Sequence, residues 1–278
     1  MRFVFGKPAL LIDDVLVVAD LHIGLEQELF EKGIRIGGVR ERILSELTEL
    51  VKETEAKKII ILGDAKHGLL NIDFEIADFF HSLLKIAPVE IAKGNHDGNI
   101  ENIAGIKVHE AEGFVLVAND GTKYGMCHGH AWPSQEVMSA DYLILAHNHP
   151  TVELVDKGGY AHREHVWAVG ALNADAAALA ERYPNANTDV KIVLVPPFNP
   201  LIGGSRINLL DSEGIGPLVK NNLFKLNDAI AYRLDGTCLG RISDLRGVDN
   251  GHKKTRARTA DNLRFMRKKG LTRQGREL

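Results

Sequence analysis

The chain has 278 residues, of which 45% are hydrophobic and 26% are charged, an ordinary balance for a soluble globular protein. No apolar run approaches the ~20 residues that a membrane-spanning helix needs. The first residues lack the charged-then-apolar pattern of a secretion signal, so we expect a cytoplasmic protein without a membrane partner.

Charge is divided unevenly along the chain. The net charge is −3, yet residues 251–278 carry ten basic and two acidic side chains, a net +8. The other residues carry 24 basic and 35 acidic side chains, a net −11. A basic tail on an acidic body suggests an anionic partner for the tail. The two cysteines, Cys127 and Cys238, give no disulfide framework, although a single bridge stays open.

The first hundred residues alternate between apolar runs and amphipathic helical patterns. Strands are predicted at residues 15–19, 57–64 and 87–95, with helices at 38–55 and 73–85. The first helix has Val39, Ile43, Leu47 and Leu50 at helical spacing, with charged residues between them. This β-α-β-α-β order predicts a parallel sheet with helical crossovers.

After residue 105 the pattern changes to short strands with little helix. The predicted strands are residues 106–111, 114–119, 123–129, 142–149, 151–156, 165–172 and 190–198, with a short helix at 174–183. We expect one large α/β domain over residues 1–215, in which two sheets lie face to face with helices outside. A small appendage over 216–250 contains a hairpin, and the tail over 251–278 is predicted to be loosely helical or disordered.

Polar side chains gather where the apolar runs end. Five stretches, "DLH", "GDAKH", "GNHD", "HGH" and "HNH", contain seven of the twelve histidines. They supply Asp20, His22, Asp64, His67, Asn95, His96, Asp97, His128, His130, His147 and His149. Open α/β sheets bind ligands at the carboxyl ends of their strands, so these stretches predict a shared site.

The spacing within the stretches indicates a metal centre. Residues i and i+2 of a strand point to the same side, so Asp20 and His22 can reach one cation, as can His147 and His149. Asp20 taken alone could instead cap a helix beginning near Gly24. Carboxylate, amide and imidazole ligands suit Mn²⁺, Fe, Zn²⁺, Co²⁺ or Ni²⁺. The donors are too many for one ion, which predicts two divalent cations roughly 3.5–4 Å apart that share a carboxylate.

The five stretches, in this order, resemble the motifs of calcineurin-like metallophosphoesterases. The resemblance covers roughly residues 10–155 and implies a double β-sandwich flanked by helices, in αββα layers. It implies a first metal site made by Asp20, His22 and His149, and a second made by Asn95, His128 and His147. Asp64 is then the bridge between the two cations, with manganese the metal we favour.

The same resemblance implies catalytic roles. His96 matches the residue that protonates the leaving oxygen, and Asp97 is expected to hold its imidazole. His67 stands where many relatives have aspartate. A histidine there is similar to the repair nucleases of the superfamily, in which it stabilises the pentavalent phosphorus. This favours a phosphodiester substrate.

A narrower resemblance points to the archaeal phosphoesterase subfamily, akin to bacterial DNA-ligase-associated phosphoesterases. It is carried by "GHAWP", "AHNHP", "PPFNPLIGG" and "DGTCLGRISDLRG", with Ala146 where the subfamily usually has glycine. It implies a role in DNA repair, with an Lhr-type helicase or a DNA ligase as partner.

For several residues and for the tail, the sequence leaves two interpretations open. His130 is a ligand or, more simply, a neighbour of the ligands, whereas His81 and His109 are expected to be structural. His162, His165 and Arg163 belong to a surface loop or line the site, and Arg206 is expected near the site. The basic tail binds nucleic acid or is merely solvated. The leading hypothesis is a nuclease or phosphodiesterase acting on nucleic acid. The alternatives are a phosphoesterase acting on a nucleotide or other small phosphoester, and a non-catalytic scaffold.

Overall fold

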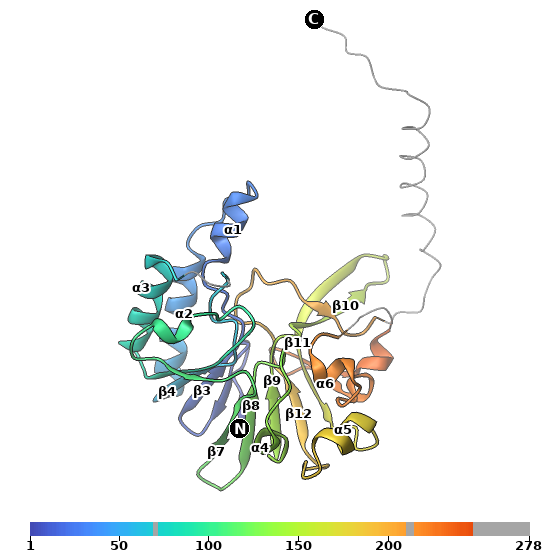
Figure 1. The fold of residues 1–278 in the computed structure, drawn as a ribbon. Coiled ribbons are helices and arrows are strands. Elements are labelled where there is room, and N and C mark those ends of the chain that lie inside the picture. Colours follow the sequence, from blue (N-terminus) through green and yellow to red (C-terminus); the bar gives the residue numbers. More distant parts are fainter. Residues whose placement is uncertain (69–71, 210–213, 247–278) are drawn as a thin grey trace, which may run out of the picture. The chain divides into compact units, whose positions relative to one another are not determined.

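The computed structural model describes residues 1–68, 72–209 and 214–246, and Figure 1 draws its ribbon. The basic tail predicted at 251–278 lies outside these residues. Among the described residues, no helix has both the length and the apolar character needed to cross a membrane. Both cysteines are free: Cys127 is buried and Cys238 is exposed, so the single bridge left open by the sequence is absent.

The first sheet has six strands in the spatial order β1-β2-β3-β4-β5-β6. They are β1 (Arg2–Phe3), β2 (Leu10–Ile12), β3 (Val15–Val18), β4 (Lys58–Ile61), β5 (Val89–Ala92) and β6 (Lys107–His109). Strands β3 to β6 are parallel neighbours, as the predicted β-α-β-α-β order requires. Their connections carry α1 (Leu25–Glu31), α2 (Val39–Thr54), α3 (Phe74–Leu84) and the 3-10 turn η1 (Ile100–Asn102).

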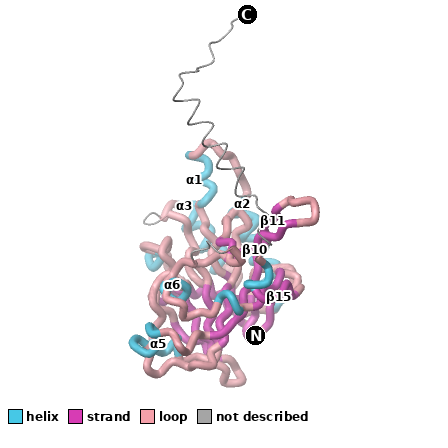
Figure 2. The backbone as a smooth tube through the Cα atoms, turned by 90° about the vertical axis from the view of Figure 1, so that its right-hand side faces the viewer, coloured by secondary structure: helices cyan, strands magenta, loops and turns pink. Residues whose placement is uncertain are grey.

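The second sheet is mixed and has the main order β13-β10-β11-β12-β9-β8-β7. Its members are β7 (Phe114–Val117), β8 (Lys123–Cys127), β9 (Tyr142–Leu145), β10 (Pro150–Val155), β11 (Ala161–Ala171), β12 (Lys191–Leu194) and β13 (Ser205–Arg206). Strands β8, β9 and β12 are parallel. Figure 2 shows the end of the β10–β11 hairpin extending away from the other strands.

The segment after residue 213 adds a hairpin to this sheet. Strand β14 (Ile230–Arg233) pairs with β11 and with β15 (Cys238–Arg241), which confirms the hairpin expected there. The remaining elements are α4 (Gln135–Met138), α5 (Ala177–Arg182), α6 (Pro217–Lys220), η2 (Leu226–Asp228) and η3 (Ile242–Leu245). The domain boundary placed at residue 215 stays a prediction.

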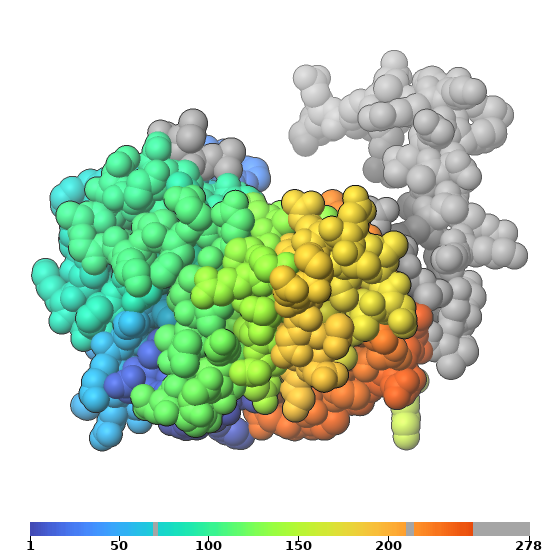
Figure 3. Space-filling view, turned by 60° about the horizontal axis from the view of Figure 1, so that its bottom comes forward, coloured from blue at the N-terminus to red at the C-terminus, as the bar shows by residue number. Residues whose placement is uncertain are grey.

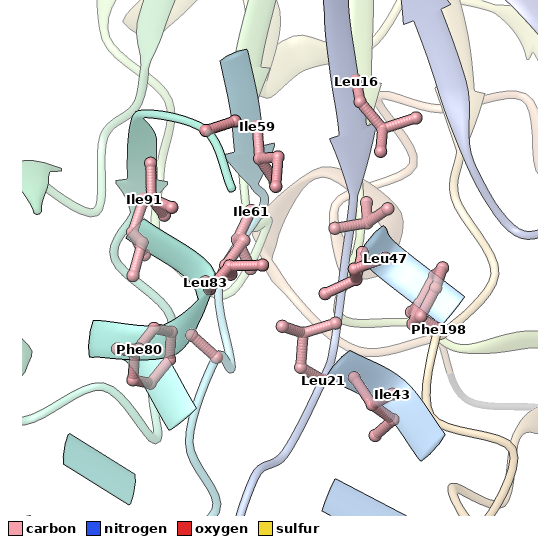
Figure 4. Close-up of a cluster of buried hydrophobic side chains, with 14 of the residues drawn as sticks. Leu16, Leu21, Ile43, Leu47, Ile59, Ile61, Phe80, Leu83, Ile91 and Phe198 are labelled. Carbon is pink, nitrogen blue, oxygen red and sulfur yellow. The ribbon is translucent and has the colours of Figure 1, made fainter. Parts of the chain in front are cut away.

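Three hydrophobic clusters show how the layers stack. Residues of α2 and α3, such as Ile43 and Phe80, pack on the first sheet, as Figure 4 shows. A second cluster joins the inner faces of the two sheets and includes Val17 and Ile144. A third packs α4, α5 and α6 on the outer face of the second sheet. Burial of these apolar faces holds the layers together.

This αββα arrangement confirms the predicted fold class. Figure 3 shows both halves at one surface, with blue to green residues of the first half on the left and yellow to red residues of the second half on the right. Strands of both sheets end near one another, and the loops that follow them contain the predicted site residues.

Candidate metal centre

The predicted ligands lie in loops that directly follow parallel strands. Val18, at the end of β3, is in register with Ile61, at the end of β4. The loops then bond to each other, because the backbone N–H of Asp20 donates to the Gly63 carbonyl at 3.1 Å. In the second sheet, β8 and β9 end in register at Cys127 and Leu145. Neighbouring strand ends therefore bring distant stretches of sequence to one place.

The local conformation of the ligands differs from the prediction. Asp20 and His22 lie beyond the end of β3, and His147 and His149 lie beyond β9, so none of the four is a strand residue. Each of the four has a positive φ, between 40° and 65°, so the conformation of the loops and not a strand pleat orients their side chains. Asp64 shares this conformation, with a φ of 48°. The left-handed conformation costs an L-residue roughly 1–2 kcal/mol, so tertiary contacts must hold these turns.

The first ligand group contains Asp20, His22, Asp64 and His149, whose donor atoms all lie within 4.8 Å of one another. His22 Nε2 is 3.4 Å from Asp64 Oδ2, and His149 Nε2 is 3.2 Å from Asp20 Oδ1. Both Asp20 oxygens and the two Nε2 atoms are buried and have no hydrogen-bond partner within the described chain. Buried polar atoms without partners are costly, and a cation would satisfy all four.

The second ligand group contains Asp64, His128 and His147. His147 Nδ1 lies 3.1 Å from His128 Nε2, and Asn95 Oδ1 lies 3.3 Å from the same atom. The Nδ1–H of His128 donates to the Leu62 carbonyl at 2.8 Å, which turns the Nε2 lone pair toward the group. Asp64 belongs to both groups, so its position is that of a bridging carboxylate.

Charge at the centre also suits cations. Burial lowers the pKa of His22 to about 4 and that of His147 to about 3, so both imidazoles are neutral at pH 7, the form that binds metal. Burial also opposes a charge on His128, but Asp64 and Asp20 outweigh it and raise the His128 pKa to about 9. A cation bound at Nε2 of His128 would displace the proton on that atom, because the same two carboxylates stabilise either positive charge. The donor set therefore fits two divalent ions.

His67 and His96 lie side by side at the edge of the first group. Their rings stack with centroids 5.3 Å apart and an interplanar angle of 15°. His96 Nδ1 bonds to the His67 carbonyl at 2.7 Å, and the backbone N–H of His96 donates to Asp64 Oδ1 at 2.9 Å. His67 Nδ1 lies 3.1 Å from His22 Nδ1. The backbone and its neighbours therefore orient both rings.

The role expected of Asp97 is wrong. Its carboxylate is fully buried and accepts backbone N–H bonds from Gly94, Ala65 and Lys66 instead of holding the His96 ring. The physical reason is that the buried carboxylate satisfies unpaired backbone donors of two loops, one in its own turn and two in the loop after β4. Burial raises the Asp97 pKa, and Asp64 adds to the rise. Asp97 therefore ties the β4 loop to the β5 loop.

Three supporting residues were missed by sequence reasoning. Glu28, on α1, bonds to His67 Nε2. Lys66 is fully buried and donates from Nζ to the carbonyls of Gly68 and His96. Asn199 is also fully buried, and its Nδ2 donates to the Leu21 carbonyl at 2.9 Å. No motif spacing marks the contacts of Glu28 with His67, Lys66 with His96 or Asn199 with Leu21, because the fold brings these partners together.

The residues with two interpretations are now placed. The His130 ring lies 5.3 Å from that of His128 and outside both ligand groups. His109 is structural, since it bonds to Glu90 Oε2 at 2.7 Å. Arg163 and Arg206 both pair with Glu153, and His162 pairs with Glu164. His81 lies on the exposed side of α3, and His165 is half-buried on β11.

Three solved structures resemble the chain. The nuclease MPE of Pseudomonas putida is 21% identical, with 80% of this chain and 85% of that chain covered and a TM-score of 0.48. Yfce, a phosphoesterase from E. coli, is 14% identical, with 82% and 97% covered and a TM-score of 0.39. An archaeal phosphodiesterase is 14% identical, with 69% and 88% covered and a TM-score of 0.37. None of the three reaches a TM-score of 0.5.

Family membership rests on sequence. No curated protein matches the chain. The sequence profile described as calcineurin-like phosphoesterase matches residues 14–209, which contain both ligand groups. The chain therefore belongs to the calcineurin-like phosphoesterase family and is a metal-dependent hydrolase of phosphoester bonds.

Proposed function

We propose that this protein is a phosphodiesterase that hydrolyses nucleic acid with two divalent cations, manganese being the metal we favour. The observation that carries the proposal is the pair of ligand groups that share Asp64. A shared carboxylate between two sets of imidazole and carboxylate donors is the arrangement that two-metal hydrolysis requires. The proposal goes beyond family membership in two respects, the nucleic-acid substrate and the choice of manganese.

Each predicted ligand has a place in this proposal. Asp20, His22 and His149 would hold the first cation, and His128, His147 and Asn95 would hold the second, with Asp64 as the carboxylate that both groups share. When bound, the two cations supply Lewis acidity that activates water and neutralises phosphoryl charge. The buried carboxylates of Asp20 and Asp64 would offset about half of the positive charge of two divalent ions.

His96 is the proposed general acid. Its Nδ1–H donates to the His67 carbonyl at 2.7 Å, so the doubly protonated ring would give the proton on Nε2 to the leaving oxygen and remain neutral with Nδ1 protonated. His67 lies against the same ring and beside His22. A second imidazole at this edge supports a role in stabilising charge on the transferred phosphoryl group.

Two features support a polynucleotide substrate. His67 occupies the position in "GDAKH" at which the chain resembles repair nucleases. Residues 251–278 carry a net charge of +8, which would attract a phosphate backbone. The same proposal includes a role in DNA repair, and a helicase or DNA ligase as partner, on the resemblance of the sequence to the archaeal subfamily.

The test is a substrate panel with the purified full-length chain and Mn²⁺. We expect turnover of bis-p-nitrophenyl phosphate, and turnover of single-stranded DNA or RNA, with loss of at least a hundredfold in His96→Ala on the nucleic acids. The good leaving group of the small ester needs less proton donation, so its rate should fall less. Turnover confined to mononucleotides would contradict the choice of substrate. Activity unchanged by EDTA and by Asp64→Asn would contradict the two-metal proposal.

A further inference from the structure

Glu28 connects α1 to the metal centre. Helix α1 begins at Leu25, three residues after His22, so it grows directly out of the first ligand loop. One carboxylate oxygen of Glu28 bonds to His67 Nε2, and the other accepts a hydrogen bond from Lys32 one turn later. The Glu28 side chain is 43% exposed, so it approaches the centre from its outer edge.

The direction of each hydrogen bond follows from the ligand group. His22 Nε2 is buried and faces Asp64, so this atom must keep its lone pair if a cation is to bind there. The proton of neutral His22 then sits on Nδ1 and is donated to His67 Nδ1, 3.1 Å away. His67 in turn carries its proton on Nε2, which donates to Glu28.

The opposite tautomer of His67 would disturb the binding of a cation by His22. If His67 carried its proton on Nδ1, two N–H donors would face each other across the 3.1 Å gap to His22. The His22 ring would turn, or its proton would move to Nε2 and block the cation. His67 also stacks on His96 and bonds to it through its carbonyl, so a displaced His67 ring would disturb His96 as well.

We propose that Glu28 is a positioning residue of this centre: by accepting the Nε2 proton of His67, it fixes the His67 tautomer and, through it, the orientations of His22 and His96. The proposal rests on the proposed function, since it assumes that His22 binds a cation and that His96 serves catalysis. It adds a residue of α1 to a centre otherwise built from strand-end loops.

Three variants distinguish the effect of the Glu28 hydrogen bond from that of its negative charge and from that of any substitution in α1. Glu28→Met removes the acceptor at similar size, and Glu28→Gln keeps an acceptor oxygen without the charge. Glu31→Met is the matched control, an exposed acid of the same helix. Each protein is labelled with ¹⁵N-histidine and loaded with Zn²⁺, and long-range ¹H–¹⁵N spectra report which ring nitrogen of His67 is protonated. The His67 signals are assigned by their loss in His67→Asn.

We expect protonated Nε2 for His67 in the unmodified protein, in Glu28→Gln and in Glu31→Met, and a mixture of tautomers in Glu28→Met. With Mn²⁺ and bis-p-nitrophenyl phosphate, kcat should fall about tenfold to a hundredfold in Glu28→Met, with KM within about twofold. Glu28→Gln should stay within about threefold.

An unchanged His67 tautomer and an unchanged kcat in Glu28→Met would overturn the proposal. An equal loss in Glu28→Gln would overturn it too, because the effect would then belong to the charge. If the unmodified protein hydrolyses none of the substrates, the proposed function fails, while the tautomer spectra still decide the role of Glu28.

Discussion

Five side chains of the metal centre lie on backbone that L-residues usually avoid. Asp20, His22, Asp64, His147 and His149 all have positive φ values. At roughly 1–2 kcal/mol each, this strain is large beside a typical folding stability of ~5–15 kcal/mol, so packing around the loops must hold it. The sequence predicted which residue types gather here, but their left-handed turns leave no mark in residue spacing.

One prediction at this scale concerns Gly63, which precedes Asp64, the proposed bridge between the two cations. Gly63 has a φ of +72°, and a Cβ added there would lie 2.5 Å from the His128 ring. Gly63→Ala should therefore displace His128 and weaken the second cation site. We expect bound manganese, measured by mass spectrometry of the dialysed protein, to fall from about two ions per chain toward one.

Gly6→Ala is the matched control, because Gly6 has a φ of +71° and no atom within 4 Å of an added Cβ. It carries the same backbone strain without the collision. If both variants keep two ions, His128 tolerates the extra carbon and the close approach is unimportant for metal binding.

At the scale of elements, strands supply the positions of the ligands and other segments lock the loops. The apolar runs and helical periodicity of the first hundred residues correctly predicted β3, α2, β4, α3 and β5. Asn199 could not be assigned its role in the same way. It bonds to the Leu21 carbonyl from 178 positions away, and its own N–H lies 3.4 Å from the Asp20 carbonyl. Such contacts follow from the layered fold and not from local pattern.

An acidic residue of β5 gives a prediction on stability. Burial disfavours the ionised form of Glu90, but bonds from Lys58, His109 and Lys107 outweigh burial and lower its pKa to about 2. A carboxyl with a lowered pKa in the folded state stabilises it above the unfolded pKa of about 4.5, and loses this effect as the pH falls toward 2. Glu90→Gln should lower the free energy of unfolding at pH 7 by about 1–3 kcal/mol.

The measurement is urea unfolding followed by circular dichroism at pH 7 and pH 3.5, on protein freed of metal with EDTA. The difference between Glu90→Gln and the unmodified protein should shrink at the lower pH. The control is Glu53→Gln, at an exposed position of α2. A difference that is the same at both pH values would show that the Glu90 charge contributes nothing.

At the scale of the whole molecule, the order of motifs and strands was enough to predict two sheets with helices outside. It was not enough to predict the strand order of the second sheet. There the short β13 lies parallel to β10, and the late strand β14 pairs with β11. Long-range pairing of short strands depends on which apolar faces meet, and several pairings satisfy the same pattern.

The uneven charge of the chain leads to a prediction on binding. Removal of residues 251–278 takes away a net charge of +8 and should weaken binding of single-stranded DNA. Fluorescence anisotropy over a salt series should show a shallower slope of log affinity against log salt in the truncated chain. Hydrolysis of bis-p-nitrophenyl phosphate should stay the same. An unchanged salt slope would favour a tail that is simply solvated.

The two ligand groups also draw on both sheets. Asp20, His22 and Asp64 follow strands of the first sheet, whereas His128, His147 and His149 follow strands of the second. Bound ions would thus add cross-links between two layers that are already joined by apolar contact and by hydrogen bonds such as that of His128 to the Leu62 carbonyl. Ions that bind only the folded chain add RT ln(1 + [L]/Kd) to its stability, about 2.7 kcal/mol at a hundredfold excess over Kd. The thermal stability of this enzyme should therefore rise and fall with the metal supply of its surroundings.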